Sequence, residues 1–431
     1  MKKILQLLSL SILTSLLFVV GCKKEEPVPA TTGTLSGTII DAISGSALAD
    51  VLVVVFDANT NSPIGASVSS GTDGAYSVEL DSGTYFVKAS KQGYEKSPPA
   101  AVAPISFNIT LGVTTTKDIE MFESTVIDGG WISGKVMAGD VAVAGALVVA
   151  DNAGVGYSTI SDEAGNYAIF NVPAATYAVN AWLAGYNSTE VSASVTAATE
   201  STGTDIVMTE GAGGSVTGSI SFLATGNLEV DVALTHPFTG ETIPGLDTVT
   251  SNYVYKLTNV PDGTYLARAS YNNDGIVMDP DWIVKNGEPR VTVNGGEVGR
   301  PFSVTNAVSV VVPTNEATSV EPVVVTTTTP TFEWTPYSAT SDYVIEVMDA
   351  NGKLIWGGFT AEYASKNVVI PGSSTSIAFG DTSVGNAPIE DLVSGKTYRW
   401  RIFASKNNQQ SATGWELISV SEDQRGLFIV E

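Results

Sequence analysis

One pattern recurs three times along this 431-residue chain and restricts it to a multi-domain fold. Each copy begins with Gly-x-[Ile/Val], continues to a Tyr, and nine or ten residues later reaches a second Tyr that follows a tight turn. The copies begin at Gly37, Gly134 and Gly218. Because a repeat of about 85 to 95 residues can bury its own core, the chain is expected to form a series of similar domains.

Each repeat consists of short strands separated by turns. Asp73-Gly74 and Gly165-Asn166 tolerate positive φ, and the tyrosines that follow them lie in stretches that alternate with period two, as antiparallel strands do. The apolar runs 51–56 and 146–150 have strand length and predict strands buried centrally in a sheet. Charged residues make up only 15% of the chain and Gly reaches 42, which also favours strands and turns. The predicted fold class is all-β, with tandem antiparallel β-sandwich domains.

The motifs Gly-x-[Ile/Val], Asp-x-x-Gly-x-Tyr and Pro-x-Gly-x-Tyr resemble those of the carboxypeptidase regulatory-like domain, a transthyretin-like or prealbumin-like seven-stranded sandwich. The resemblance implies two such domains, at residues 33–123 and 128–210, and a divergent prealbumin-like sandwich at 213–312. In that third copy Ser251-Asn252-Tyr253 replaces the acidic turn, and the segment 271–296 is longer than the pattern provides.

The C-terminal part follows a different pattern. Leu-x-x-Gly-x-x-Tyr, at residues 392–398, resembles the tyrosine corner of fibronectin type III and immunoglobulin-like sandwiches. The resemblance implies a fibronectin type III-like domain at 320–431 with a longer middle insertion at 353–387. In such a domain Tyr398 bonds to backbone upstream, and Trp334 is a core tryptophan of an early strand.

The N-terminal segment is typical of an exported lipoprotein. Two lysines precede an uncharged apolar run at 4–20 that is short for a membrane span. Val19-Val20-Gly21-Cys22 resembles the lipobox of bacterial lipoproteins, so we expect a signal peptide at 1–21, a lipidated Cys22 and a tether at 22–32. The following Lys-Lys-Glu-Glu resembles an export signal of surface lipoproteins, which implies a surface-exposed location in the outer membrane. The alternative is an uncleaved anchor helix with an incidental cysteine.

Charge and composition exclude several functions. Lys+Arg total 21 against 45 Asp+Glu, a net charge of −24 that becomes −26 (19 against 45) once the two lysines of 1–21 are removed, and this disfavours nucleic-acid binding. A single Cys cannot form an internal disulfide, and a single His, His236, cannot complete a carboxypeptidase zinc site. The resemblance is therefore to the accessory domain alone, and neither catalysis nor a cofactor is expected.

Aromatic residues provide the main binding hypothesis, because flat rings stack on the apolar faces of sugars. Trp131, Trp334 and Trp400 lie in alternating strand patterns and are expected to pack in the interior. The candidate ligand-binding residues are those in or beside loops: Tyr271, Trp282, Trp356 and Trp415.

A calcium site is a weaker hypothesis. Asp274, Asp279 and Asp281 place carboxylate oxygens close together in the extra segment of the third domain, and calcium needs only oxygen ligands. Asn/Asp/Gly/Pro clusters are usually only turns, so no metal is assigned.

Two functions follow from these observations. The first is a non-catalytic, lipid-anchored cell-surface protein whose β-sandwich modules bind carbohydrate or protein ligands. The alternative is a structural stalk or adhesin-like spacer that presents the C-terminal domain without a small-molecule ligand. The short linkers near 123–128 and 210–213 predict a rigid rod four domains long in either case.

Overall fold

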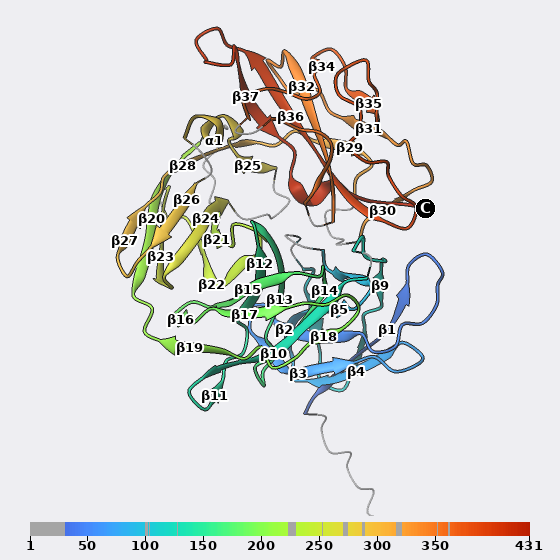
Figure 1. Cartoon of the computed structure of the whole chain (residues 1–431), viewed down its shortest axis with the longest axis vertical. Coiled ribbons are helices and arrows are strands. Elements are labelled where there is room, and N and C mark those ends of the chain that lie inside the picture. The colour runs from blue at the N-terminus through green and yellow to red at the C-terminus, as the bar shows by residue number, and fades with distance from the viewer. Residues whose placement is uncertain are drawn as a thin grey trace, which may run out of the picture.

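The computed structural model describes residues 31–431, apart from 100, 101, 103, 127, 223–229, 252, 270–274, 287–288, 316–320, 351 and 361–362. The predicted all-β class is confirmed, since these residues form four sandwiches and include a single short α-helix (Figure 1). Within the described ranges, no helix has the length and apolar character needed to cross a membrane.

The first sandwich shows how the repeat folds. Its strands are β1 (Gly33–Asp41), β2 (Leu52–Asp57), β3 (Pro63–Ser69), β4 (Ala75–Leu80), β5 (Gly83–Lys91), β6 (Tyr94–Ser97), β7 (Phe107–Ile109), β8 (Thr114–Thr116) and β9 (Ile119–Met121). In one sheet β1 pairs antiparallel with β4 and parallel with β8 and β9. The other sheet has the order β3-β2-β5-β6, with β7 also on β5. Leu35, Val53 and Tyr85 are buried in the core that these two sheets share.

The second sandwich repeats this arrangement. Its strands are β10 (Gly130–Ala138), β11 (Val141–Ala142), β12 (Leu147–Asn152), β13 (Val155–Ile160), β14 (Asn166–Val172), β15 (Thr176–Trp182), β16 (Tyr186–Ser188), β17 (Val191–Ser194), β18 (Glu200–Ser201) and β19 (Ile206–Glu210). Here β10 takes the place of β1, because it pairs antiparallel with β14 and parallel with β18 and β19.

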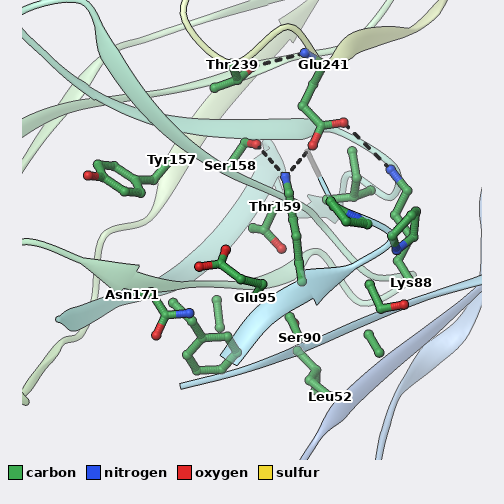
Figure 2. Close-up of a pocket in the computed structure, with 18 of the residues that line it drawn as sticks. Leu52, Lys88, Ser90, Glu95, Tyr157, Ser158, Thr159, Asn171, Thr239 and Glu241 are labelled. Atoms are coloured by element: carbon green, nitrogen blue, oxygen red, sulfur yellow. Dashed lines mark hydrogen bonds and ion pairs between the residues drawn. The ribbon is translucent and has the colours of Figure 1, made fainter. Parts of the chain in front are cut away.

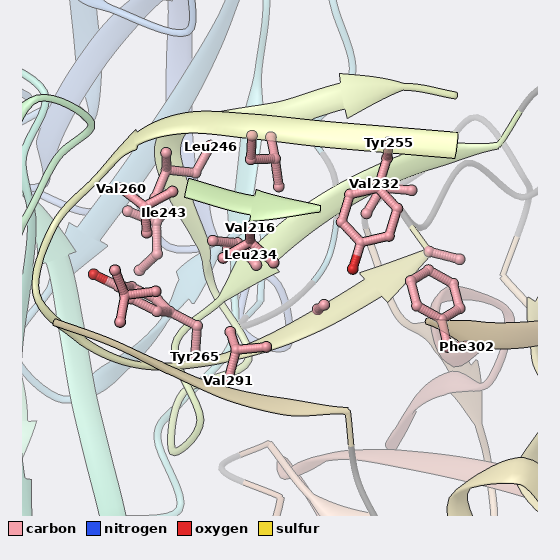
Figure 3. Packing of buried hydrophobic residues seen from close by; sticks show 14 of the residues in the cluster. Val216, Val232, Leu234, Ile243, Leu246, Tyr255, Val260, Tyr265, Val291 and Phe302 are labelled. Carbon is pink, nitrogen blue, oxygen red and sulfur yellow. The ribbon is translucent and has the colours of Figure 1, made fainter. Parts of the chain in front are cut away.

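The third sandwich has the same pairing despite its weaker sequence pattern. Its elements are β20 (Gly214–Phe222), β21 (Asp231–Thr235), β22 (Thr242–Val249), β23 (Val254–Val260), β24 (Gly263–Ala269), β25 (Ile276–Met278), α1 (Pro280–Asn286), β26 (Arg290–Val293), β27 (Glu297–Gly299) and β28 (Phe302–Asn306). β20 pairs antiparallel with β23 and parallel with β27 and β28. Figure 3 shows its core, in which Val216, Leu234 and Tyr265 are buried.

The Gly and the first Tyr of the repeat both lie against one backbone carbonyl of a neighbouring segment. Gly37 lies opposite Tyr76 in the register, and a Cβ on Gly37 would lie 1.9 Å from the carbonyl oxygen of Lys117. The Tyr76 hydroxyl donates a hydrogen bond to that same oxygen over 2.6 Å. The other two repeats have the same arrangement, in Gly134 with Tyr167 and Gly218 with Tyr255. Glycine makes room for the passing strand, and tyrosine satisfies its carbonyl.

The fourth sandwich has a different topology. Its elements are β29 (Val310–Val312), β30 (Val323–Val325), β31 (Thr331–Trp334), β32 (Asp342–Asp349), β33 (Leu354–Gly357), β34 (Ile370–Pro371), β35 (Ser376–Ala378), β36 (Thr397–Asn407), β37 (Trp415–Val420), η2 (Asp423–Arg425) and β38 (Leu427–Val430). One sheet has the order β29-β31-β35 and the other β30-β38-β36-β32-β33, with β34 on β32 and β37 on β36.

Two predictions about the core of the fourth sandwich are confirmed. The Val393 N–H donates to the Tyr398 hydroxyl oxygen over 2.9 Å, which is the expected bond to upstream backbone. Trp334 and Trp400 are both buried in this core. Trp131, by contrast, is only half-buried in β10 of the second sandwich.

The apolar runs at 51–56 and 146–150 are buried, as predicted, because their strands are covered on both faces. In β12, Val148 and Ala150 belong to the core of the second sandwich, whereas Leu147 and Val149 belong to the core of the third. The outer face of one sandwich therefore serves as a wall of the next.

The expected rod is wrong, because the chain curls and brings the fourth sandwich next to the first (Figure 1). The Asn171 amide of the second sandwich donates to the Tyr94 carbonyl of the first over 2.6 Å. Lys396 of the fourth sandwich bonds to the Ser124 carbonyl, beside the first sandwich, and lies 3.7 Å from Glu123. Short linkers did not produce a rod because apolar outer faces bring the sandwiches side by side.

Candidate functional site

Three of the predicted site residues lie outside the described residues. They are Cys22, the predicted lipidation site, Tyr271, a predicted binding aromatic, and Asp274, a weak calcium candidate. Their roles remain predictions.

Trp356 is not a surface residue, and its expected place in a binding platform is wrong. Its side chain is fully buried in the core of the fourth sandwich, and its indole N–H donates to the Asn386 carbonyl over 2.9 Å. Its ring packs edge-on against Phe379, with centroids 5.4 Å apart. The insertion that carries Asn386 and Phe379 folds back over β33, so a residue that flanks a loop in sequence is interior in space.

Trp282 and Trp415 lie in separate clusters. Trp282, in α1, is half-buried against the core of the third sandwich. Trp415 is half-buried on the outer face of the fourth, where Phe359 stacks against it at 5.9 Å. The Lys366 ammonium lies 4.4 Å from the centroid of the Trp415 ring, so a face of this indole is already occupied. The three candidate tryptophans therefore do not form one shared platform.

Asp279 and Asp281 have local partners. The Asp279 carboxylate accepts the Asp281 N–H over 3.0 Å at the start of α1, and Asp281 pairs with Lys285 at 2.5 Å. Burial raises the pKa of Asp279 to about 6. No group of three or more His, Cys, Asp or Glu side chains that could hold a metal ion occurs in the described part of the chain. The geometry gives Asp279 a helix-capping role and Asp281 an ion pair within the helix.

A pocket that the sequence did not indicate lies where the four sandwiches meet (Figure 2). We call it the junction pocket; it has a volume of about 130 Å³. Its lining includes Leu52, Lys88 and Glu95 of the first sandwich, Ser158 and Thr159 of the second, and Glu241 of the third. Ala350 of the fourth sandwich also reaches it.

A cluster of charges spans the junction pocket. Glu241, on the third sandwich, bonds to the Lys96 ammonium of the first, and the Lys96 ammonium also lies 3.1 Å from the Ser158 hydroxyl of the second. Lys88 lies 4.0 Å from the other Glu241 oxygen. Burial alone would raise the pKa of Glu241, but the two lysines outweigh it and hold this pKa at about 2. This carboxylate therefore stays ionised and joins three sandwiches.

A second carboxylate lies apart from this cluster. Glu95 accepts the Thr125 N–H over 2.9 Å, and Figure 2 shows its side chain within the pocket. Burial raises the pKa of Glu95, and the hydrogen bonds from Thr125 and Ser124, together with the charge of Lys396, offset this only in part. The pocket thus holds separate positive and negative regions.

Part of the pocket wall is apolar. Phe56 and Phe86 stack with centroids 4.9 Å apart on the outer face of the first sandwich. Val54 lies beside them, and Ile160 of the second sandwich packs against this group. The arrangement can hold a small molecule with an apolar body and charged ends.

The sequence carried little signal for this pocket. Lys88 alternates with Val87 and Ala89 along β5, a pattern that normally places lysine in solvent. Glu241 follows an ordinary turn beside His236. Only the packing of the sandwiches against one another converts these surface positions into a lining.

His236 is packed between aromatic rings. It is buried beside Trp182, with ring centroids 5.6 Å apart, and its Nδ1 accepts the Phe238 N–H over 3.3 Å. Burial lowers its pKa to about 4, so the imidazole is neutral at physiological pH.

Comparisons with known proteins identify the first two sandwiches. The family model of the carboxypeptidase regulatory-like domain matches residues 34–121 and 132–209. No curated protein matches the chain.

Three solved structures illustrate the structural likenesses. The Bacillus anthracis TIE protein is 16% identical, with 64% of this chain and 51% of that chain covered and a TM-score of 0.18, so the match spans about half of that protein. BcpA, the major pilin subunit of Bacillus cereus, is 12% identical; the match covers 64% of this chain and 100% of that chain, with a TM-score of 0.18. The shaft pilin SpaA of Lactobacillus rhamnosus GG is 11% identical; the match covers 42% of this chain and 98% of that chain, with a TM-score of 0.19.

The repeat motifs, the strand pairing and the family match agree on the same two segments. Residues 34–121 and 132–209 each match the carboxypeptidase regulatory-like domain.

Proposed function

We propose that the protein is a non-catalytic, lipid-anchored cell-surface protein whose β-sandwich modules bind a carbohydrate or protein ligand. The observation that carries the proposal is the junction pocket, which is lined by residues from all four sandwiches. Ligand pockets occur preferentially at domain interfaces and combine apolar walls with a few polar groups. The volume of about 130 Å³ suits one side chain or one terminal unit of a larger ligand.

The curled arrangement favours ligand binding over a spacer. A stalk gains length from domains joined end to end, whereas here Lys396 brings the fourth sandwich back to Ser124, next to the first. Four sandwiches folded together extend a shorter distance from a membrane than four in a row. The fourth, which has a bonded tyrosine at Tyr398, is a fibronectin type III-like domain in this proposal.

The lipid anchor is proposed from the sequence around Cys22, the only cysteine of the chain. Expression in a Gram-negative host with radiolabelled palmitate should label the wild-type protein and leave Cys22→Ala unlabelled. External protease should then digest the wild-type protein on intact cells if the chain is displayed on the surface. Labelling of Cys22→Ala would contradict the assignment.

Ligand binding can be tested by affinity electrophoresis of residues 23–431 through gels that contain polysaccharides, together with pull-down of proteins from the outer surface of the cell. Leu52→Trp should abolish capture because the larger ring fills the junction pocket from β2. Trp415→Ala is the matched variant at the aromatic cluster and should leave capture unchanged. Loss of capture in Trp415→Ala, with retention in Leu52→Trp, would move the binding site to the fourth sandwich.

A further inference from the structure

We propose that the junction pocket takes a small zwitterionic ligand, with its anionic group on Lys88 and its ammonium group on Glu95. This inference rests on the proposed ligand-binding function and adds the chemical class of the ligand. An ω-amino acid has this chemistry, and so does a C-terminal lysine on a protein partner.

The Lys88 end of the pocket has an unused donor and an excess positive charge. No side-chain hydrogen bond to the Lys88 ammonium is formed by any described residue, and its nearest carboxylate oxygen, on Glu241, is 4.0 Å away. Glu241 is already engaged by Lys96, which also contacts Ser158. Two ammonium groups therefore share one carboxylate. An anionic ligand group beside Lys88 would supply the missing acceptor and balance the charge.

The Glu95 end has the opposite imbalance. Its carboxylate accepts hydrogen bonds from the Thr125 N–H and the Ser124 side chain, and the positive charge of Lys396 acts on it without an ion pair between these two residues. The nearby Asp349 adds a like charge rather than a counter-charge. An ammonium group bound here would supply the direct ion-pair partner that Lys396 does not.

The middle of the pocket sets the body of the ligand. Leu52, Val54 and Phe56 line the pocket from the outer face of β2, so the part of the ligand that lies on this face must be apolar. Lys88 lies opposite Val54 in the register, beside this apolar face. A volume of about 130 Å³ holds on the order of ten non-hydrogen atoms. A simple acid of this size would meet the negative charge of Glu95, and a simple amine would meet the excess charge of the lysines. Only a ligand with both charges satisfies both ends.

Isothermal titration of the mature lipoprotein in detergent micelles tests this class. The probes are ω-amino acids from 3-aminopropanoate to 6-aminohexanoate, each compared with the acid and the amine of the same chain length. We expect one length to bind best, and to bind at least about tenfold more tightly than its acid or amine. Equal affinity for all three members of a length set would overturn the proposal.

Two variants assign the ends. Lys88→Met should remove the advantage over the amine, and Glu95→Gln should remove the advantage over the acid. Lys135→Met and Glu190→Gln change exposed residues of the second sandwich and should bind like the wild type. Thermal unfolding of each variant shows whether it is folded, and a folded Lys88→Met that binds unchanged would contradict the anion site.

Two further comparisons distinguish a protein ligand from a free small molecule, and the zwitterion class from the binding function itself. A peptide that ends in lysine should bind with a free carboxyl terminus and fail to bind when amidated if the ligand is a protein end, whereas binding of the free ω-amino acid alone indicates a small molecule. If no probe binds but Leu52→Trp still abolishes capture of a polysaccharide or protein, the zwitterion class is wrong and the binding function stands. If neither occurs, the binding function itself fails.

Discussion

Trp182 of the second sandwich lies edge-on against Tyr265 of the third, with ring centroids 5.5 Å apart and ring planes at 79°. The contact depends on a glycine of the repeat. A Cβ on Gly263 would lie 2.4 Å from Cζ3 of Trp182. The Pro-x-Gly-x-Tyr turn of one domain therefore accommodates an aromatic side chain of its neighbour, and the two sandwiches are joined through side chains as well as through the short linker.

Gly263→Ala is expected to destabilise the junction between the second and third sandwiches by about 1 to 3 kcal/mol, the usual cost of overpacking. Trp182→Ala should also destabilise it, because it leaves a cavity beside Tyr265. In the double variant the clash is gone, so the combined cost should be less than the sum of the two. Chemical denaturation of the four proteins measures this coupling, and simple additivity would contradict it.

The tyrosine of each repeat should matter because of its hydroxyl group. Tyr167→Phe removes the donor to the Thr204 carbonyl, which leaves a buried acceptor unpaired and should cost about 1 to 3 kcal/mol. Tyr186→Phe is the control, since the Tyr186 hydroxyl bonds to the exposed Glu210 and should contribute much less. Equal midpoints of thermal unfolding for the two variants would show that the Tyr167 bond is not important.

The sequence predicted those features that lie within one domain. The repeat tyrosines and glycines, the buried runs and Tyr398 all act on neighbours in the same sandwich, so spacing alone located them. The curled arrangement and the junction pocket could not be predicted in this way. Lys88, Glu241 and Trp356 each have ordinary local sequences, and their environments are set by a different sandwich or by a distant insertion.

The ion cluster of the junction pocket predicts a loss of stability in acid. The pKa of Glu241 is about 2 in the folded protein and near its ordinary value of 4.5 in the unfolded chain, so its contribution to stability is present above pH 4.5 and is lost as pH falls toward 2. A shift of this size corresponds to about 3 kcal/mol. Glu241→Gln should be less stable at neutral pH and should lose less on acidification between pH 4.5 and 2. Denaturant unfolding at each pH measures the free energy of unfolding of both proteins. Equal losses of stability in the two proteins would show that the cluster does not couple the sandwiches.

His236 should destabilise the fold at mildly acid pH. Its pKa is about 4 in the folded protein and has the ordinary value of 6.5 in the unfolded chain. Between these two pH values the unfolded chain is protonated at His236 and the folded protein is not. Stability should therefore fall as pH drops from 6.5 to 4, by about 3 kcal/mol in total. His236→Gln should remove this slope. Because the chain has one histidine, its imidazole signal in proton NMR reports the pKa directly, and a value near 6.5 would contradict the prediction.

Asp279 should have the opposite pH dependence. Burial raises its folded pKa to about 6 from an ordinary value of 3.8, so the folded state is favoured while the group is protonated and loses stability as pH rises from 3.8 to 6. Asn also caps helices but carries no charge to bury, so Asp279→Asn should be more stable than the wild type above pH 6, by up to about 3 kcal/mol. The two proteins should converge near pH 4 in thermal unfolding. A variant that is less stable at pH 7 would show that the charge is needed at this position, and would bring back the calcium hypothesis that includes Asp281.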